Sequence, residues 1–290
     1  MDADRADERP VALWRRQADR TAWLVTALER HPTVTWVHTD TAGVDRLPLA
    51  RMQQRGILLS HARGVHTPAV AEWTVAALFT AAKRMDVVVR HSDLRAWIPP
   101  TGTRQLAGAH VLVLGLGSIG SAIAVCCRAL GMRVTGVVRD AHTRVTESPT
   151  DVLVGTDDGW HHLLSDISYV VLSAPLTSAT RGLLGRRALR LLPPHAWIIN
   201  VARGELLDEE ALVEELDAGR LGGAVLDAFS QEPLPTGHQL WGRPNVIVSP
   251  HSSSQADTSD ARAAALFLKE AGRFTRSEPL VSACEYDKGY

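Results

Sequence analysis

The chain has 290 residues, of which 45% are hydrophobic and 22% are charged, and its formal net charge is −1. These values are typical of a soluble globular protein of two domains and exclude the basic field that would hold nucleic acid. The polar N-terminus does not resemble a signal peptide, and no apolar run reaches the ~18 residues of a membrane span. The three cysteines form neither a disulfide framework nor a metal motif. We therefore expect a cytoplasmic protein that binds no membrane or metal.

The first part of the chain alternates between short apolar runs and helical patterns. The expected strands and helices are, in order, 10–14, about 19–30, 33–39, 47–55 and 56–60. A long apolar helix from about Pro68 to Arg84 follows, with proline near its start, where the missing N–H costs nothing. Residues 91–107, which include Pro99 and Pro100, are predicted to be irregular.

From His110 onward, strand and helix patterns alternate regularly. The expected strands are 111–115, 133–138, 169–174, 196–200, 223–229 and 245–250, and the expected helices are 121–131, 184–192, 207–218 and about 256–274. Such alternation predicts an α/β fold with a parallel sheet that helices cover on both faces, a doubly wound sheet of the Rossmann type.

A glycine motif, GLGSIG, follows the apolar run that begins this second part and opens a helix. In that context Gly115 permits a tight turn, Gly117 lets the backbone approach a pyrophosphate, and Gly120 lets the helix pack on the strand. Ser118 and Ile119 begin the helix, whose N-terminus favours anionic phosphates. A turn that merely connects strand and helix is the alternative, and the strand–turn–helix context favours dinucleotide binding.

The residue that normally binds the adenosine ribose is expected at the end of the next strand. Counting 18 positions from Gly120 gives Val138, with Arg139 next. Without a carboxylate to repel a 2′-phosphate, and with a guanidinium to bind it, this pair predicts NADP as the preferred cofactor and NAD as the alternative. In the competing interpretations Arg139 is solvated, or Asp140 replaces the missing acid.

Three polar residues, Arg203, Glu232 and His251, each follow an apolar run. The carboxyl ends of parallel strands form the edge at which ligands bind, so these side chains are expected to gather there. A guanidinium, a carboxylate and an imidazole can grip a carboxylate or carbonyl and move a proton. Taken singly, each residue can be interpreted as a helix cap or a loop residue without a catalytic role. Together with the glycine turn they predict an alcohol/ketone oxidoreductase.

The twelve histidines differ in their expected surroundings. Most, among them His38 and His110, lie in polar stretches or loops and are predicted to be solvated. His61 and His66 flank Arg63 and Gly64 at another strand end and are candidate cleft residues.

These motifs resemble those of the D-isomer-specific 2-hydroxyacid dehydrogenases, which include glyoxylate/hydroxypyruvate reductases and phosphoglycerate dehydrogenases. The similarity runs from about Trp36 to Tyr290. The matching segments are TAGVD (41–45), HARGVH (61–66), AVAEW (69–73), GLGSIG (115–120), SAPLTSATRGLL (173–184), NVARGELLDEEAL (200–212), GGAVLDAFSQEPLP (222–235) and NVIVSPHSSS (245–254).

The resemblance implies a role for each matching residue. His251 is the acid/base group, Glu232 is its partner, and Arg203 binds the substrate. The backbone N–H groups of a substrate-binding turn hold the substrate carboxylate, and that turn consists of Arg63, Gly64 and Val65. Further cofactor-binding positions are Pro175, Thr180, Ala202 and Asp227, the last near the nicotinamide carboxamide.

The resemblance also implies a domain division: a dinucleotide-binding domain over 66–256 and a flavodoxin-like substrate domain over 1–65, to which a C-terminal helix in 257–290 returns. Members of the family usually begin with a further strand–helix–strand, so the substrate domain is expected to be N-terminally shortened. A sheet edge is then expected near residues 10–14, with Trp14 and Trp23 on an apolar surface.

The implied activity is NAD(P)-dependent reduction of a small 2-keto acid, such as glyoxylate or hydroxypyruvate, to the D-2-hydroxy acid by a homodimer joined through the cofactor domain. The Val138–Arg139 pair resembles the NADP-using glyoxylate/hydroxypyruvate reductase branch. Two alternatives stay open: a nicotinamide-sensing binding protein of the corepressor type, which can retain the same three polar residues, and a relative that oxidises formate or phosphite.

Overall fold

The structure is a computed structural model, which describes residues 11–16, 21–141 and 148–289. Pro10 and Asp19, with which two expected elements begin, lie outside the described residues. The chain divides into two compact units. Unit 1 comprises residues 1–66 and 256–290, and unit 2 comprises residues 67–255. No described helix is long and apolar enough to cross a membrane.

Unit 1 contains a parallel sheet with the order β1-β2-β3, and its strands confirm the three that the sequence predicts. The elements of unit 1 are β1 (Val11–Arg15), α1 (Thr21–Arg30), β2 (Val34–Thr39), α2 (Leu49–Gln54), β3 (Leu58–His61) and α8 (Ser259–Thr275).

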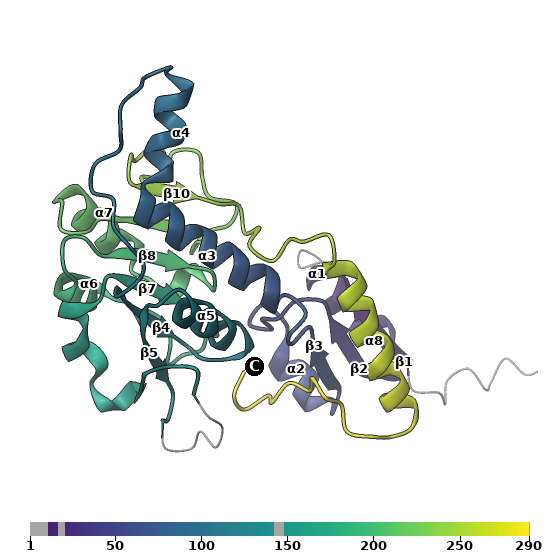
Figure 1. The fold of residues 1–290 in the computed structure, drawn as a ribbon. Helices are drawn as coiled ribbons and strands as arrows, with labels where there is room; N and C mark the ends of the chain where they lie inside the picture. Colours follow the sequence, from purple (N-terminus) through teal and green to yellow (C-terminus); the bar gives the residue numbers. More distant parts are fainter. Residues whose placement is uncertain (1–10, 17–20, 142–147, 290) are drawn as a thin grey trace, which may run out of the picture. The chain divides into compact units, whose positions relative to one another are not determined.

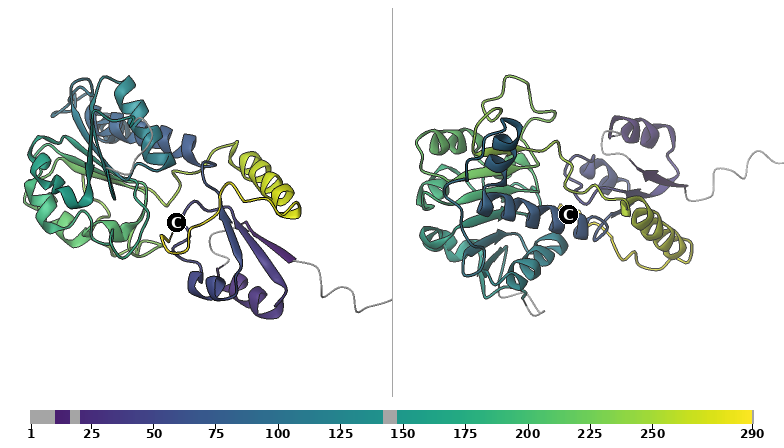
Figure 2. Two further views of the ribbon diagram at one scale, coloured as in Figure 1. Left: turned by 90° about the horizontal axis from the view of Figure 1, so that it is seen from below. Right: turned by 45° about the horizontal axis from the view of Figure 1, so that its top comes forward.

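Alternating side chains of β2 meet different helices on the two faces of this sheet. Val37 packs with Leu24 and Leu28 of α1, whereas Trp36 stacks on Phe267 of α8, with ring centroids 5.7 Å apart. Figure 2 shows α8, in yellow, on one face of the strands and the α1–α2 side on the other. The expected edge strand is β1, and its Trp14 stacks on Phe267 at 4.1 Å. The apolar surface expected at this edge is therefore covered by α8 at Trp14.

The prediction that His38 and His110 are solvated is wrong. His38 is fully buried, because it lies on the same face of β2 as Trp36, and its Nδ1 is 2.7 Å from Ser60 Oγ. Burial lowers the pKa of His38 to about 4. His110 is 7% exposed, and its Nε2 lies 2.8 Å from the hydroxyl of Thr135.

Unit 2 contains a parallel sheet of seven strands in the order β10-β9-β8-β7-β4-β5-β6. Its helices are α3 (Thr67–Lys83), α4 (Met85–Asp93), α5 (Ser118–Ala129), α6 (Arg186–Leu191) and α7 (Glu209–Asp217). Its strands are β4 (His110–Leu114), β5 (Arg133–Val138), β6 (Val152–Gly155), β7 (Tyr169–Leu172), β8 (Trp197–Asn200), β9 (Gly223–Leu226) and β10 (Val246–Val248). Short 3₁₀ segments lie at Thr156–Asp158, Trp160–Asp166 and Gly204–Leu206.

Helices cover both faces of the large sheet (Figure 1). Apolar side chains of α3 and α5 pack on one face, and those of α6 and α7 pack on the other, so most strand residues are buried. The predicted α/β fold with a doubly wound parallel sheet is confirmed. The chain adds β5 and β6 on one side of β4 and then crosses to β7 on the other. This reversal is a topological switch point, at whose carboxyl edge open α/β sheets bind ligands.

Two elements of unit 2 differ from the sequence prediction. β6 is an additional strand, and residues 91–93, which were expected to be irregular, belong to α4. The helix is hard to see in the sequence because it contains three consecutive β-branched residues, Val87–Val89, which favour strands over helices. Its one buried side chain is Asp86, which accepts hydrogen bonds from Arg84 at 3.1 Å.

The burial of His38 predicts that unit 1 loses stability in mild acid. Because its folded pKa is lowered from 6.5 to about 4, the unfolded chain takes up the proton first as pH falls. The free energy of unfolding that His38 contributes is therefore fully present above pH 6.5 and is lost as the pH falls toward 4. Between pH 7 and pH 5 the loss is about 2 kcal/mol. Glu270 opposes this shift and His61 adds to it.

Urea titrations that follow unit 1 at pH 7 and pH 5 measure this loss. His38→Gln should flatten the pH dependence, whereas His31→Gln, at an exposed position, should leave it unchanged. An equally steep dependence in His38→Gln would show that other groups carry it.

Candidate active site

The glycine turn after β4 lies at the switch point and is packed too tightly for side chains at two of its three glycines. A Cβ on Gly115, whose φ is +96°, would lie 2.5 Å from the backbone of Ala174, and one on Gly120 would lie 1.9 Å from the carbonyl oxygen of Gly115. At Gly117 no heavy atom lies within 4 Å of such a position. The turn is thus closed toward the protein and open where a ligand would approach.

Helix α5 begins at Ser118 in this open space, and no side chain caps its N-terminus at Gly117. The first N–H groups of a helix, including those of Ser118 and Ile119, have no partner within the helix, and the helix dipole adds partial positive charge there. The turn therefore has the open space and the free backbone N–H groups that a pyrophosphate would need.

The end of β5 lies beside this turn, because the N–H of Gly115 donates to the carbonyl of Val137 at 2.8 Å. Val138 ends β5, and Arg139 and Asp140 follow it with exposed side chains. Arg139 and Asp140, the two candidate ribose-binding residues, thus follow the strand end that lies beside the glycine turn. Arg144, a second cation that could assist Arg139, lies outside the described residues.

Pro175 and Thr180 belong to one turn after β7. The Thr180 hydroxyl donates to the carbonyl of Pro175 at 2.7 Å and accepts from the N–H of Thr177 at 2.8 Å. This hydroxyl therefore fixes the shape of the turn. The hydrogen bonds of Thr180 go to the backbone of the segment that borders the switch point.

Arg203 follows β8 in a turn that Asn200 shapes. The Asn200 side chain is fully buried, accepts from the N–H of Ala202 at 3.0 Å and donates to the carbonyl of Arg203 at 2.9 Å. A Cβ on Gly204 would lie 1.9 Å from the backbone of Phe229. The segment that carries Arg203 therefore lies directly against the loop after β9, in which Glu232 is found.

Glu232 and His251 form a hydrogen-bonded pair. The Nδ1–H of His251 donates to the two carboxylate oxygens of Glu232, at 2.9 and 3.1 Å, because an ionised carboxylate only accepts. Glu232 also accepts the N–H of Phe229 at 3.1 Å. Nδ1 is thus committed to Glu232, and Nε2 is the ring nitrogen left to exchange a proton with a substrate. The His251 side chain is 41% exposed, so solvent and small molecules reach it.

Asp227, at the end of β9, holds the turn that carries His251. It is 1% exposed and accepts the hydroxyl of Ser249 at 2.5 Å and the N–H groups of Ser252 and Ser253 at 2.8 Å each. His251 has a left-handed backbone, with φ +53°, which few non-glycine residues adopt. The bonds on both sides of His251 stabilise that conformation. The carboxylate of Asp227 is therefore a structural acceptor, whatever else it contacts.

The substrate-binding turn expected at 63–65 lies in unit 1. The N–H of Arg63 donates to the carbonyl of His61 at 2.7 Å, and the N–H of Val65 donates to that of Ala62 at 3.1 Å. Within the described part of the chain, Gly64 alone of the three has an N–H without a hydrogen bond, and its φ is +86°. If this turn binds an anion, the N–H of Gly64 is the group available for it.

The sequence does not predict three residues that position Arg203, Glu232 and His251. Asn200 and Ser249 lie within the apolar runs that predict β8 and β10, so only their polarity at a strand end marks them. Phe229 contributes through its backbone N–H, which no sequence pattern reveals.

Comparison with known proteins places these features in a family. A family model described as "D-isomer specific 2-hydroxyacid dehydrogenase, NAD binding domain" matches residues 74–253. Among curated proteins, a glyoxylate reductase of Thermofilum pendens is 32% identical over 246 residues, which cover 82% of this chain and 71% of that protein.

Solved structures are similar over nearly the whole chain. A D-isomer specific 2-hydroxyacid dehydrogenase of Xanthobacter autotrophicus, in complex with NADPH and MES, has a TM-score of 0.79 and 30% identity and covers 91% of this chain and 81% of its own. An NADPH-dependent glyoxylate/hydroxypyruvate reductase of Sinorhizobium meliloti, in complex with NADP and sulfate, has a TM-score of 0.81 and 25% identity, with coverage of 98% and 88%.

Proposed function

Because the chain belongs to the D-isomer specific 2-hydroxyacid dehydrogenase family, and is thus an NAD(P)-dependent dehydrogenase, we propose that it reduces a small 2-keto acid of the glyoxylate or hydroxypyruvate type to the D-2-hydroxy acid, with NADPH as the preferred cofactor. The observation that carries this proposal is the pair of Glu232 and His251 at the carboxyl edge of the sheet, near which the glycine turn offers a dinucleotide site.

The chain's own residues supply proton transfer and charge. The nicotinamide, when bound, supplies a hydride to the keto carbon. His251, protonated and oriented through Nδ1 by Glu232, donates a proton from Nε2 to the substrate oxygen. General acid catalysis of this kind contributes ~10²–10⁴-fold. Arg203 binds the substrate carboxylate or the polarised carbonyl, a task for which a permanently charged planar guanidinium is suited.

The preference for NADPH rests on Val138 and Arg139. An apolar residue at the strand end leaves no carboxylate to repel a 2′-phosphate, and the exposed guanidinium beside it can form charge-assisted hydrogen bonds to that group. The NADP and NADPH complexes of the two similar structures support the same choice.

The proposed homodimer is supported by an apolar surface on unit 2. Helix α4 extends away from the sheet in Figure 1. Five large apolar side chains on this helix and in the segment after it are at least 43% exposed. They are Met85, Val89, Leu94, Trp97 and Ile98. Extended apolar patches on a protein surface usually mark interaction sites, and a second copy of the chain is the occupant we propose.

Removing the acid/base pair should stop the reaction without removing the cofactor. His251→Asn should lose most 2-keto acid reductase activity while NADPH still binds. Glu232→Gln should also lower kcat, because a neutral amide holds and orients the Nδ1–H of His251 more weakly than a carboxylate does. Steady-state NADPH oxidation with glyoxylate, hydroxypyruvate and larger 2-keto acids measures both effects.

Glu210→Gln, at an exposed position of α7, is the matched control and should leave kcat unchanged. A kcat that Glu232→Gln also leaves unchanged would refute the pairing. A wild type that binds NADPH but reduces none of the substrates would favour the nicotinamide-sensing alternative.

Arg139→Ala should remove most of the preference for NADPH. Hydrogen bonds to charged groups contribute about 1.5–3 kcal/mol each, so the wild type should prefer NADPH at least about tenfold in kcat/KM. The variant should weaken NADPH and change NADH little, which makes NADH the internal control. Equal kcat/KM values for the two cofactors in the wild type would instead mean that Arg139 is a solvated loop residue.

The apolar surface around α4 predicts association in solution. Sedimentation equilibrium should give a dimer for the wild type and a shift toward monomer for the double variant Leu94→Ser/Trp97→Ser. Leu191→Ser, which changes a 41% exposed leucine on α6, should remain dimeric. A monomeric wild type would contradict this part of the proposal.

A further inference from the structure

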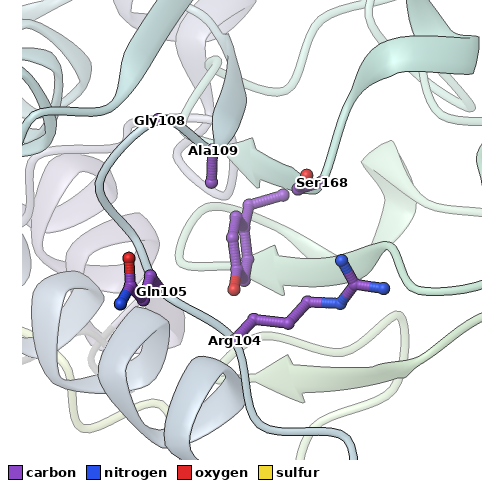
Figure 3. Close-up of a pocket in the computed structure, with 6 residues that line it drawn as sticks. Arg104, Gln105, Gly108, Ala109 and Ser168 are labelled. Atoms are coloured by element: carbon purple, nitrogen blue, oxygen red, sulfur yellow. The ribbon is translucent and has the colours of Figure 1, made fainter.

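Unit 2 contains a cavity of about 310 Å³ that the proposed reaction does not use. It is lined by Arg104, Gln105, Gly108, Ala109, Ser168 and Tyr169. Figure 3 shows Arg104 and Gln105 along one side and Gly108, Ala109 and Ser168 along the other. Its volume lies at the lower end of the range of about 300–1,000 Å³ that is typical of small-molecule sites.

The cavity lies at the amino edge of the sheet. Ala109 immediately precedes β4, and Ser168 immediately precedes β7. Arg203, Glu232 and His251 follow the carboxyl ends of their strands. The two edges are separated by the length of the strands, roughly 13–16 Å at ~3.3 Å per residue. The cavity is therefore a separate place on the molecule.

The charge of the lining is positive. Arg104 is its one charged side chain, and no carboxylate lines the cavity. Among the residues that the structure describes, none forms an ion pair with the Arg104 guanidinium. The backbone of Arg104 is fixed, because its N–H donates to the carbonyl of Ala82 at 2.7 Å and its carbonyl accepts from Lys83 Nζ at 2.9 Å. The Lys83 ammonium is thereby held at the backbone of Arg104.

The electrostatic influence of Arg104 extends to the groups around the cavity. Burial lowers the pKa of His195, and the positive charge of Arg104 lowers it further. Burial raises the pKa of Tyr169, and Arg104 opposes that rise. Arg104 thus disfavours positive charge, and favours negative charge, on groups near it.

Neutral hydrogen-bonding groups and an apolar wall complete the lining. The Ser168 hydroxyl lies 3.3 Å from Nε2 of His195, which is partly buried beside the cavity. Gln105 contributes an exposed amide, and Tyr169, which is 2% exposed, contributes an aromatic ring. A guanidinium, neutral donors and an aromatic surface are the groups that bind an oxyanion attached to a small organic body.

We propose that this cavity is a binding site for a small organic oxyanion, a carboxylate or phosphoryl compound, whose charge pairs with Arg104 and whose body rests against Tyr169. Ser168 and Gln105 supply hydrogen bonds to the ligand. The site is independent of the proposed reductase activity, and binding is measurable without turnover.

Calorimetric titration of the NADP-saturated protein with citrate and with inorganic phosphate tests the proposal. Saturation with NADP fills the phosphate-binding turn and the region of Arg139, and an Arg203→Gln background removes the proposed substrate-binding cation, because all of these groups would otherwise compete for anions. At least one probe should bind with one-to-one stoichiometry. Arg104→Gln should weaken that binding at least about tenfold, since a charge-assisted contact is lost. Arg187→Gln, which removes an exposed arginine on α6, is the matched control and should bind as the wild type does.

Ser168→Ala provides a second variant should Arg104→Gln fold poorly, and it should weaken binding severalfold. Tighter binding of citrate would identify a carboxylate ligand, and tighter binding of phosphate would identify a phosphoryl ligand. The proposal is overturned if neither probe binds at millimolar concentration, or if Arg104→Gln and Ser168→Ala both bind as tightly as the wild type.

Discussion

The candidate active site depends on one buried carboxylate. Asp227 is almost inaccessible to solvent, and a buried carboxylate is costly unless hydrogen bonds satisfy it. Three donors from the turn after β10 do so, and the turn is thereby held on both sides of His251. That restraint maintains the left-handed backbone of His251 and brings its Nδ1 to Glu232. The pair of Glu232 and His251 therefore depends on a third residue, Asp227, which fixes the loop that carries His251.

The parallel sheet brings the remaining groups to the same edge. β8, β9 and β10 are neighbours, so the segments that follow them, with Arg203, Glu232 and His251, begin side by side. Gly204 allows the first two of these segments to touch, since any side chain there would collide with the backbone of Phe229. The glycine turn after β4 belongs to the same edge, at the point where the strand order reverses. One architecture thus brings the glycine turn and the pair of Glu232 and His251 to the same edge of the sheet.

Much of this arrangement is predictable from sequence because the signals are strong and local. Strands buried on both faces give continuous apolar runs, and glycines and charges at their ends mark the edge. Other features depend on tertiary contacts that no local pattern encodes. His38 looks like a solvated residue until α8 covers its strand, and α4 contains valines that favour strands. The bonds of Asp227 join residues more than 20 positions apart, so sequence shows the acid without its partners.

In the proposed reaction, a hydride from the nicotinamide and a proton from His251 reach the two ends of one carbonyl. The most direct test is reduction of hydroxypyruvate with NADPH deuterated at C4 on the face that transfers the hydride, followed by mass and chiral analysis of the product. We expect the D-hydroxy acid with deuterium at C2. An unlabelled product, or a labelled product of the L configuration, would contradict it.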